Sequence, residues 1–141
     1  MRLRATLRLD PDAEQRLVER LSRDRFVQVA YLFGSGVRQR LRFDSDLDVG
    51  VASSPGPLSP AEMRSVAQQI AEVTGRAADV VDLASASAPV LRAAMVEGRQ
   101  LLCTDRALLL ALRRRLVYET EDFLPYQRRL LDERRRRWIG T

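Results

Sequence analysis

Two aspartates one residue apart, Asp46 and Asp48, are the residues of this chain best suited to chemistry. They follow a Gly34-Ser35 turn, which itself ends a hydrophobic run at 26–33. In a strand the side chains alternate between faces, so the two carboxylates point the same way, about 6–7 Å apart. Such a pair is costly without a cation, and oxygen-only ligation suits Mg²⁺. Because a Gly-Ser turn offers backbone N–H groups and a hydroxyl to phosphates, the pattern favours nucleoside-triphosphate chemistry. The structural alternative is a strand-end cap and an ordinary turn.

The spacing of these residues resembles the signature of a known superfamily. Gly-Ser followed ten residues later by Asp-x-Asp is similar to the motif of the nucleotidyltransferases that include DNA polymerase β and kanamycin nucleotidyltransferase. The short chain most resembles the minimal nucleotidyltransferase (MNT) antitoxins of HEPN/MNT toxin–antitoxin pairs. Softer similarities at 79–83, 89–102 and 118–126 extend the resemblance over roughly residues 26–131.

The resemblance implies roles for the motif residues. Asp46 and Asp48 would hold the metal ions, and Gly34 with Ser35 would cradle the β- and γ-phosphates of ATP. Arg38 falls where the family usually has an arginine, and it would contact the triphosphate.

A third carboxylate is expected on the strand at 78–83. Asp79 and Asp82 are the candidates, and because they are three residues apart they face opposite sides of a regular strand. The resemblance favours Asp79, which would serve as metal ligand and would polarise or deprotonate the attacking hydroxyl. Gln39 departs from the glycine usual at its position, which puts in doubt how closely the loop approaches phosphate.

The composition narrows the chemistry further. The 141 residues are enough for one domain with its own core, and the net charge is +5. The chain has no histidine and no lysine, which excludes His-based triads and metal sites and a P-loop lysine. No apolar run approaches the ~20 residues of a membrane helix. The single Cys103 fits a reducing environment, so we expect a cytoplasmic protein without membrane association.

The pattern of hydrophobic residues and caps predicts an α+β fold. We expect a small mixed β-sheet of the nucleotidyltransferase type with helices packed on one side of it, in a single domain spanning 1–141 with its core at about 10–103. Helices are predicted to begin near Asp10, Ser59 and Ser87, the second of them ending at Gly75. Strands are predicted at 26–33, 46–52, 78–83 and 99–103.

A long C-terminal helix is predicted over about 104–138, capped by Thr104. Its apolar residues recur at spacings of three and four, and part of this stripe must pack on the domain. Beyond Pro125 the stripe has little local core to cover, which suggests a partner surface; full packing within the chain is the alternative. The Arg134–Arg137 run fits a solvated tail, a nucleic-acid contact or an acidic partner.

By the resemblance, the chain would be an antitoxin that transfers AMP from ATP·Mg²⁺ to a tyrosine of a cognate HEPN ribonuclease toxin, with the C-terminal helix helping to form a hetero-oligomer. One alternative is a non-catalytic antitoxin that acts by occlusion, and another is a nucleotidyltransferase for a small-molecule hydroxyl. Direct nucleic-acid binding is not expected, because the chain lacks a binding fingerprint and has few aromatic residues.

Overall fold

The computed structural model describes residues 9–34, 37 and 46–119. Its elements follow the predicted order, and a final helix is described over residues 106–119. The named elements are α1 (Pro11–Ser22), β1 (Val29–Phe33), β2 (Leu47–Ala52), α2 (Pro60–Thr74), β3 (Ala78–Asp82), α3 (Ala88–Met95) and β4 (Arg99–Cys103). The predicted α+β class with a mixed sheet is confirmed. Strand β1 begins three residues later than the strand predicted at 26–33. The preceding residues form a turn, in which Asp24 accepts a hydrogen bond from the backbone N–H of Phe26.

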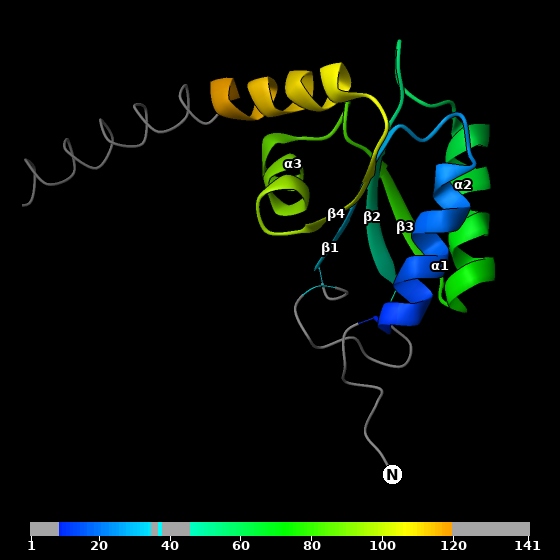
Figure 1. Ribbon diagram of the computed structural model, residues 1–141. Coiled ribbons are helices and arrows are strands. Elements are labelled where there is room, and N and C mark those ends of the chain that lie inside the picture. Colours follow the sequence, from blue (N-terminus) through cyan, green and yellow to red (C-terminus); the bar gives the residue numbers. More distant parts are fainter. Residues whose placement is uncertain (1–8, 35–36, 38–45, 120–141) are drawn as a thin grey trace, which may run out of the picture.

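The four strands form one sheet in the order β3-β2-β1-β4. Strand β1 runs antiparallel to both β2 and β4, whereas β2 and β3 are parallel. A parallel pair needs a crossover connection, and α2 supplies it. Figure 1 shows this crossover helix to one side of the sheet.

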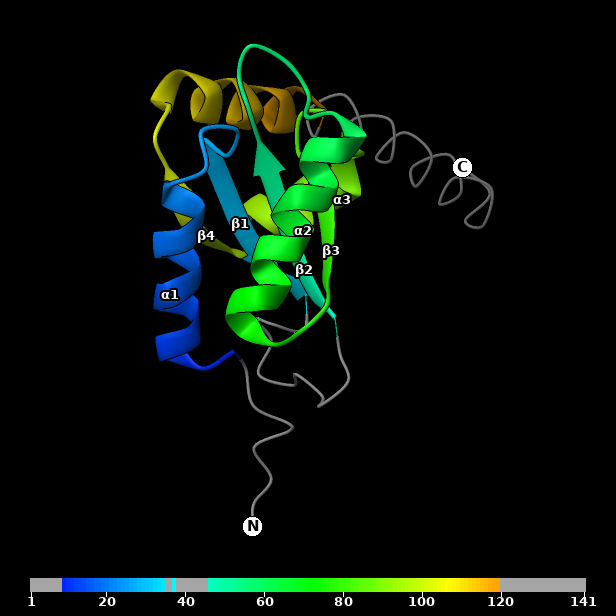
Figure 2. The ribbon, with the colours of Figure 1, turned by 90° about the vertical axis from the view of Figure 1, so that its right-hand side faces the viewer.

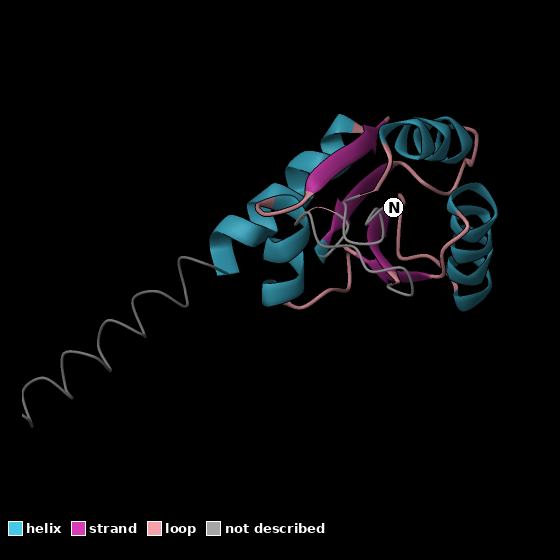
Figure 3. Ribbon diagram, turned by 90° about the horizontal axis from the view of Figure 1, so that it is seen from below, coloured by secondary structure: helices cyan, strands magenta, loops and turns pink. Residues whose placement is uncertain are grey.

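Helices cover both faces of the sheet, which corrects the prediction of a one-sided arrangement. Helices α1 and α2 pack on one face, and α3 and the final helix pack on the other, as the view from below shows (Figure 3). The alternation within β2 explains this: Leu47, Val49 and Val51 face α1 and α2, while Ala52 faces the opposite cluster. The prediction failed because strands buried on both faces show no clear hydrophobic alternation.

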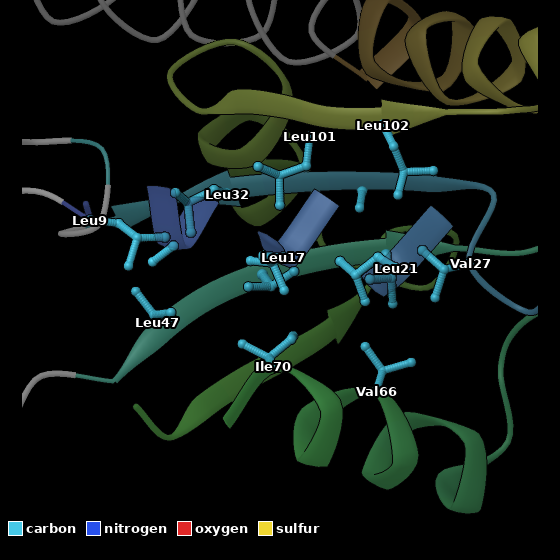
Figure 4. Packing of buried hydrophobic residues seen from close by; sticks show 14 of the residues in the cluster. Leu9, Leu17, Leu21, Val27, Leu32, Leu47, Val66, Ile70, Leu101 and Leu102 are labelled. Atoms are coloured by element: carbon cyan, nitrogen blue, oxygen red, sulfur yellow. The ribbon is translucent and has the colours of Figure 1, made fainter. Parts of the chain in front are cut away.

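The larger core lies between the sheet and the pair α1 and α2 (Figure 4). Leu17 and Leu21 of α1 and Val66 and Ile70 of α2 are fully or almost fully buried there. Burial of each such side chain contributes about 1.5–3 kcal/mol to folding. This packing fixes the two helices against the strands that carry the candidate site.

The predicted caps define where α1 and α2 begin and where α2 ends. Asp10 accepts a bond from the N–H of Ala13, and Ser59 and Glu62 form the reciprocal capping box at the start of α2. Gly75 ends α2 in the left-handed conformation, with a φ of 72°. These caps place the start of β3 directly after α2.

The final helix begins one residue later than predicted. Asp105, not Thr104, caps it by accepting from the N–H of Leu108 at 3.1 Å, because the Thr104 hydroxyl turns to the carbonyl of Gln28. Arg115 fastens the helix to the loop after β3 by donating to the carbonyls of Ala84 and Ala86. The helix is thus fixed on the α3 side of the sheet (Figure 1). The rest of the predicted helix, including Pro125 and Arg134–Arg137, lies outside the described residues.

Within the described ranges, no helix is both long and apolar enough to cross a membrane.

Candidate functional site

Three strand ends bring the candidate residues to one edge of the sheet. Gly34 follows the end of β1, Asp46 directly precedes β2, Asp48 is its second residue, and Asp79 is the second residue of β3. Since β1 is antiparallel to β2, its end meets the beginning of β2; since β2 and β3 are parallel, they begin at the same edge. Figure 3 looks onto this edge.

Asp48 and Asp79 are direct neighbours in the sheet. They are register partners of the parallel β2–β3 pair, and Phe33 is the partner of Asp48 on β1. Register partners project to the same face of a sheet, so both carboxylates lie on the face that α3 covers. Asp46, two residues before Asp48, is exposed at the same edge.

The accumulated negative charge changes the acidity of the central carboxylate. Burial raises the pKa of Asp48, and the negative charges of Asp79 and then Asp46 raise this pKa further. Asp48 is half-buried, whereas Asp46 and Asp79 are exposed. The site therefore holds an electrostatic cost that a bound cation would offset.

Asp82 is occupied elsewhere. Its Oδ2 accepts from the N–H of Leu58 at 2.9 Å, and its Oδ1 accepts from the N–H of Ala84 at 2.9 Å. It alternates with Val81 and Leu83, which pack in the cluster on the α3 side, and so projects to the other face. The structure thus brings Asp79, and not Asp82, beside Asp48.

Gly34 has a structural role at the site that the motif alone did not reveal. Its φ of 69° lies in the left-handed region, and the N–H of Val37 donates to its carbonyl at 3.1 Å, so the backbone turns at once after β1. A Cβ added here would lie 2.3 Å from Oδ2 of Asp48. Glycine therefore leaves room for the Asp48 carboxylate; the only signal in the sequence was its place in the motif.

Ser35, Arg38 and Gln39, which the resemblance assigned to the phosphate-binding loop, lie outside the described residues. Their predicted roles in nucleotide binding stay predictions.

The chemistry of the donor set fits Mg²⁺. Asp46, Asp48 and Asp79 offer only carboxylate oxygens, and burial together with the neighbouring carboxylates raises the pKa of Asp48. Among the described side chains, no three acidic or cysteine groups converge closely enough to hold a metal by themselves. Mg²⁺ does not need such a cage, because it usually takes one or two protein carboxylates and completes its shell with water and substrate phosphates.

The comparisons with solved structures give a consistent fold. A chain of a toxin–antitoxin crystal structure with AMP-PNP matches with a TM-score of 0.66 and 25% identity, covering 84% of this chain and 96% of that one. The toxin-antitoxin MntA-HepT structure matches with a TM-score of 0.63, 21% identity and coverages of 88% and 97%. A chain from the complex of a tri-AMPylated Shewanella oneidensis HEPN toxin with an MNT antitoxin matches with a TM-score of 0.62 and 22% identity. The match covers 86% of this chain and 96% of that one.

Curated protein sequences gave no match. The family model described as polymerase β, nucleotidyltransferase, matches residues 15–107, which include every described element of the site. The superfamily resemblance predicted from the Gly-Ser and Asp-x-Asp motif is thereby confirmed. This chain belongs to the polymerase β nucleotidyltransferase family.

Proposed function

We propose that this nucleotidyltransferase is the antitoxin of a HEPN/MNT pair and transfers AMP from ATP to a tyrosine of its cognate HEPN toxin. The observation that carries the proposal is the pairing of Asp48 with Asp79 at the edge where Gly34 turns. The similar structures support the choice of substrate, since one holds AMP-PNP and one a tri-AMPylated HEPN toxin beside an MNT antitoxin.

In this proposal Asp46, Asp48 and Asp79 form the carboxylate site for Mg²⁺, which would take one or two of these carboxylates at a time and complete its shell with water and triphosphate oxygens. Gly34, Ser35 and Arg38 bind the triphosphate. Mg²⁺ would supply positive charge to phosphate oxygens as negative charge develops on them. Asp79 is exposed, so an acceptor hydroxyl can reach it from solvent. Its carboxylate would orient that hydroxyl and accept its proton.

The transfer forms one phosphorus–oxygen bond and breaks another. The tyrosine oxygen bonds to the α-phosphorus of ATP, and the bond from that phosphorus to the bridging oxygen of the β-phosphate breaks. Pyrophosphate leaves with the electron pair of the broken bond, and the tyrosine proton passes to Asp79. The product is a tyrosine phosphodiester of AMP, which places a bulky anion on the toxin.

The outward face of the final helix is our proposed docking surface for the toxin. Leu109 and Leu112 are buried beneath it, yet Leu110, Val117 and Tyr118 on the opposite face are 53%, 53% and 60% exposed. Exposed arginines, Arg113 and Arg114, lie along the same outward face. Aromatic and arginine side chains around apolar ones are typical of binding hot spots, and the arginines favour a partner with an acidic rim.

A neutralisation experiment at low antitoxin concentration tests the proposal. The HEPN ribonuclease is incubated with this chain at a twentyfold molar excess of toxin, with ATP and Mg²⁺, and its RNase activity is then measured. An enzyme turns over, so nearly all RNase activity should disappear.

An ATP analogue with a methylene bridge between the α- and β-phosphates is the matched control, because it binds like ATP but cannot release AMP. With this analogue, RNase activity should persist. Neutralisation that needs one antitoxin per toxin and proceeds equally with the analogue would contradict AMP transfer and indicate occlusion.

A further inference from the structure

A concavity lined mainly by polar residues lies at the opposite end of the sheet from the carboxylates. Its volume is about 510 Å³, and it is bounded by the end of α1, the segment leading into β1, and the middle of α2. Its residues at 20–26 precede β1, whereas Gly34 follows that strand, so the cavity and the candidate site lie at opposite ends of β1. Figure 2 shows these two ends of the strand, with the end of α1 beside the first. We call it the arginine pocket; its lining is Arg20, Arg23, Asp24, Arg25, Phe26, Ser65 and Gln69.

The one carboxylate in the arginine pocket is already engaged. Oδ1 of Asp24 accepts from the N–H of Phe26 at 2.9 Å, and its Oδ2 accepts from Nε2 of Gln69 at 2.7 Å. Asp24 therefore fastens the turn before β1 to α2. The Asp24 side chain is half-buried, and each of its oxygens already accepts one hydrogen bond. The three arginines of the lining carry only donors, so they provide most of the hydrogen-bonding groups that remain for a ligand.

Two of the three arginines have no acidic partner within the part of the chain that the structure describes. Arg20 pairs with Glu72 at 2.7 Å, but neither Arg23 nor Arg25 has a carboxylate within 4.0 Å among the described residues. Arg20 and Arg23 lie at the C-terminal end of α1, where the negative end of the helix dipole favours a positively charged side chain. The dipole does not account for Arg25, which lies beyond the helix with its guanidinium 5.0 Å from the centre of the Phe26 ring.

Phe26 adds an apolar surface to this donor-rich wall. The residue is 37% exposed, although it directly precedes the buried Val27. An exposed ring beside unpaired guanidinium groups can stack a nucleobase while the guanidinium groups bind its phosphate. An acidic peptide would use the arginines but would gain little from the ring.

We propose that the arginine pocket binds a nucleotide unit, with phosphate on Arg23 and Arg25 and the base against Phe26. The volume lies in the range of small-ligand sites. The same unit occurs as a free nucleotide and as a residue of single-stranded RNA, and both present this chemistry. This proposal departs from the sequence-based expectation, which was against direct nucleic-acid binding because the chain lacks a binding fingerprint and has few aromatic residues. The lining of the pocket comes from two segments that only the packing of α1 on α2 brings together, so no single stretch of sequence shows it.

Backbone amide NMR on the full chain locates the binding. The Asp48→Asn variant without Mg²⁺ serves as the background, so that the candidate catalytic site contributes least, and it is titrated with UMP, with a ten-residue oligouridylate and with hexaglutamate. We expect UMP or the oligonucleotide to shift the amides of residues 23–26, 65 and 69. Shifts with both indicate an RNA residue, and shifts with UMP alone indicate a free nucleotide.

Fluorescence anisotropy with the labelled oligonucleotide measures the contribution of each group. The Arg23→Ala/Arg25→Ala variant should bind at least about tenfold more weakly, with a salt slope shallower by about 0.7 for each lost phosphate contact. Phe26→Leu should weaken binding about fivefold or more and leave the salt slope unchanged. A matched Arg92→Ala/Arg113→Ala variant removes the same charge from the other side of the sheet and should bind within twofold of the background.

Three results would overturn the proposal. One is the absence of nucleotide-induced shifts in the pocket, and another is a response there to hexaglutamate alone, which would indicate an acidic protein partner. The third is an equal loss of binding in the two double-arginine variants, which would mean that only net charge matters. Because the variants alter exposed side chains, unchanged thermal midpoints are expected and verify folding.

Discussion

Gly34 and Asp48 are packed so closely that a single methyl group would not fit between them. A Cβ built on Gly34 would lie 2.3 Å from Oδ2 and 3.2 Å from the carboxyl carbon of Asp48. A side chain at position 34 would therefore force the Asp48 carboxylate or the turn after β1 to shift. The present position of this carboxylate thus depends on a glycine at position 34.

The Gly34→Ala substitution should disable the site through this contact. We expect AMP transfer to fall at least about 100-fold, because displaced charge-stabilising groups cost on that order. The left-handed φ adds about 1 kcal/mol of backbone strain. Activity and the free energy of unfolding are both measured.

Two other glycines separate the causes of this loss. Gly75 shares the positive φ but has open space around it, so Gly75→Ala should cost the strain alone and leave the specific activity intact. Gly56 has neither constraint, and Gly56→Ala should be close to neutral. If Gly34→Ala behaved like Gly75→Ala in the activity assay, close packing against Asp48 would not matter for function.

Asp48→Asn should stabilise the metal-free chain while abolishing activity. An acid whose pKa is raised by folding binds its proton more tightly in the folded state, so the free energy of unfolding falls as pH rises from about 4 through the raised pKa of Asp48. The asparagine variant should lose this part of the pH dependence and melt at a higher temperature at pH 7. Thermal melts across pH measure both effects.

Added Mg²⁺ and ATP should stabilise the wild-type chain more than the Asp48→Asn variant. Mg²⁺ binds the ionised wild-type site more tightly than the variant, so the wild-type midpoint should rise more with Mg²⁺ and ATP. A metal-free Asp48→Asn chain that is less stable than wild type at pH 7 would argue against the carboxylate repulsion.

Asp79 and Asp82 should separate function from stability. Asp79→Asn should reduce AMP transfer at least about 100-fold. It should not lower the free energy of unfolding, because the exposed Asp79 carboxylate repels the Asp48 carboxylate and this repulsion is removed. Asp82→Ala should instead cost about 1–3 kcal/mol, because the N–H groups of Leu58 and Ala84 lose their acceptor. Comparing initial rates with denaturant unfolding distinguishes the two roles; an inactive Asp82→Ala chain with native stability would exchange them.

A charge on the outer face of the final helix should weaken toxin binding only. Leu110→Glu places a carboxylate among exposed arginines opposite the buried Leu109 and Leu112, so the fold should be unaffected. We expect toxin affinity to fall about tenfold or more by calorimetry. Arg92→Glu, on α3, is the control and should bind as wild type does; equal affinities for all three chains would place the toxin elsewhere.

The sequence contained enough local information for most of the fold. Caps such as Ser59 with Glu62 and the stop at Gly75 are local hydrogen-bonding arrangements, so a single stretch of sequence specifies them. The sequence-based expectation of helices on one side of the sheet was wrong. The residues of β1 and β2 are mostly buried on both faces of the sheet, so their pattern does not tell which face each helix covers.

In the candidate site, too, local features could be predicted from the sequence, whereas features that depend on contacts between strands could not. The spacing within Asp46 and Asp48 needs only the strand period, whereas the choice between Asp79 and Asp82 depends on register with β2, which is a long-range property. The resemblance favoured the residue that the register places beside Asp48. The contact of Gly34 with Asp48 joins two strands, and no local pattern could give it.

Intact-mass spectrometry of the cognate HEPN toxin tests the central claim most directly. The toxin is incubated with this chain, ATP and Mg²⁺, and in parallel with the Asp46→Asn/Asp48→Asn variant or without the metal. We predict that the toxin gains the mass of one or more AMP units only in the complete reaction, on a tyrosine that fragmentation identifies. A toxin of unchanged mass in a stable complex with this chain would contradict AMP transfer.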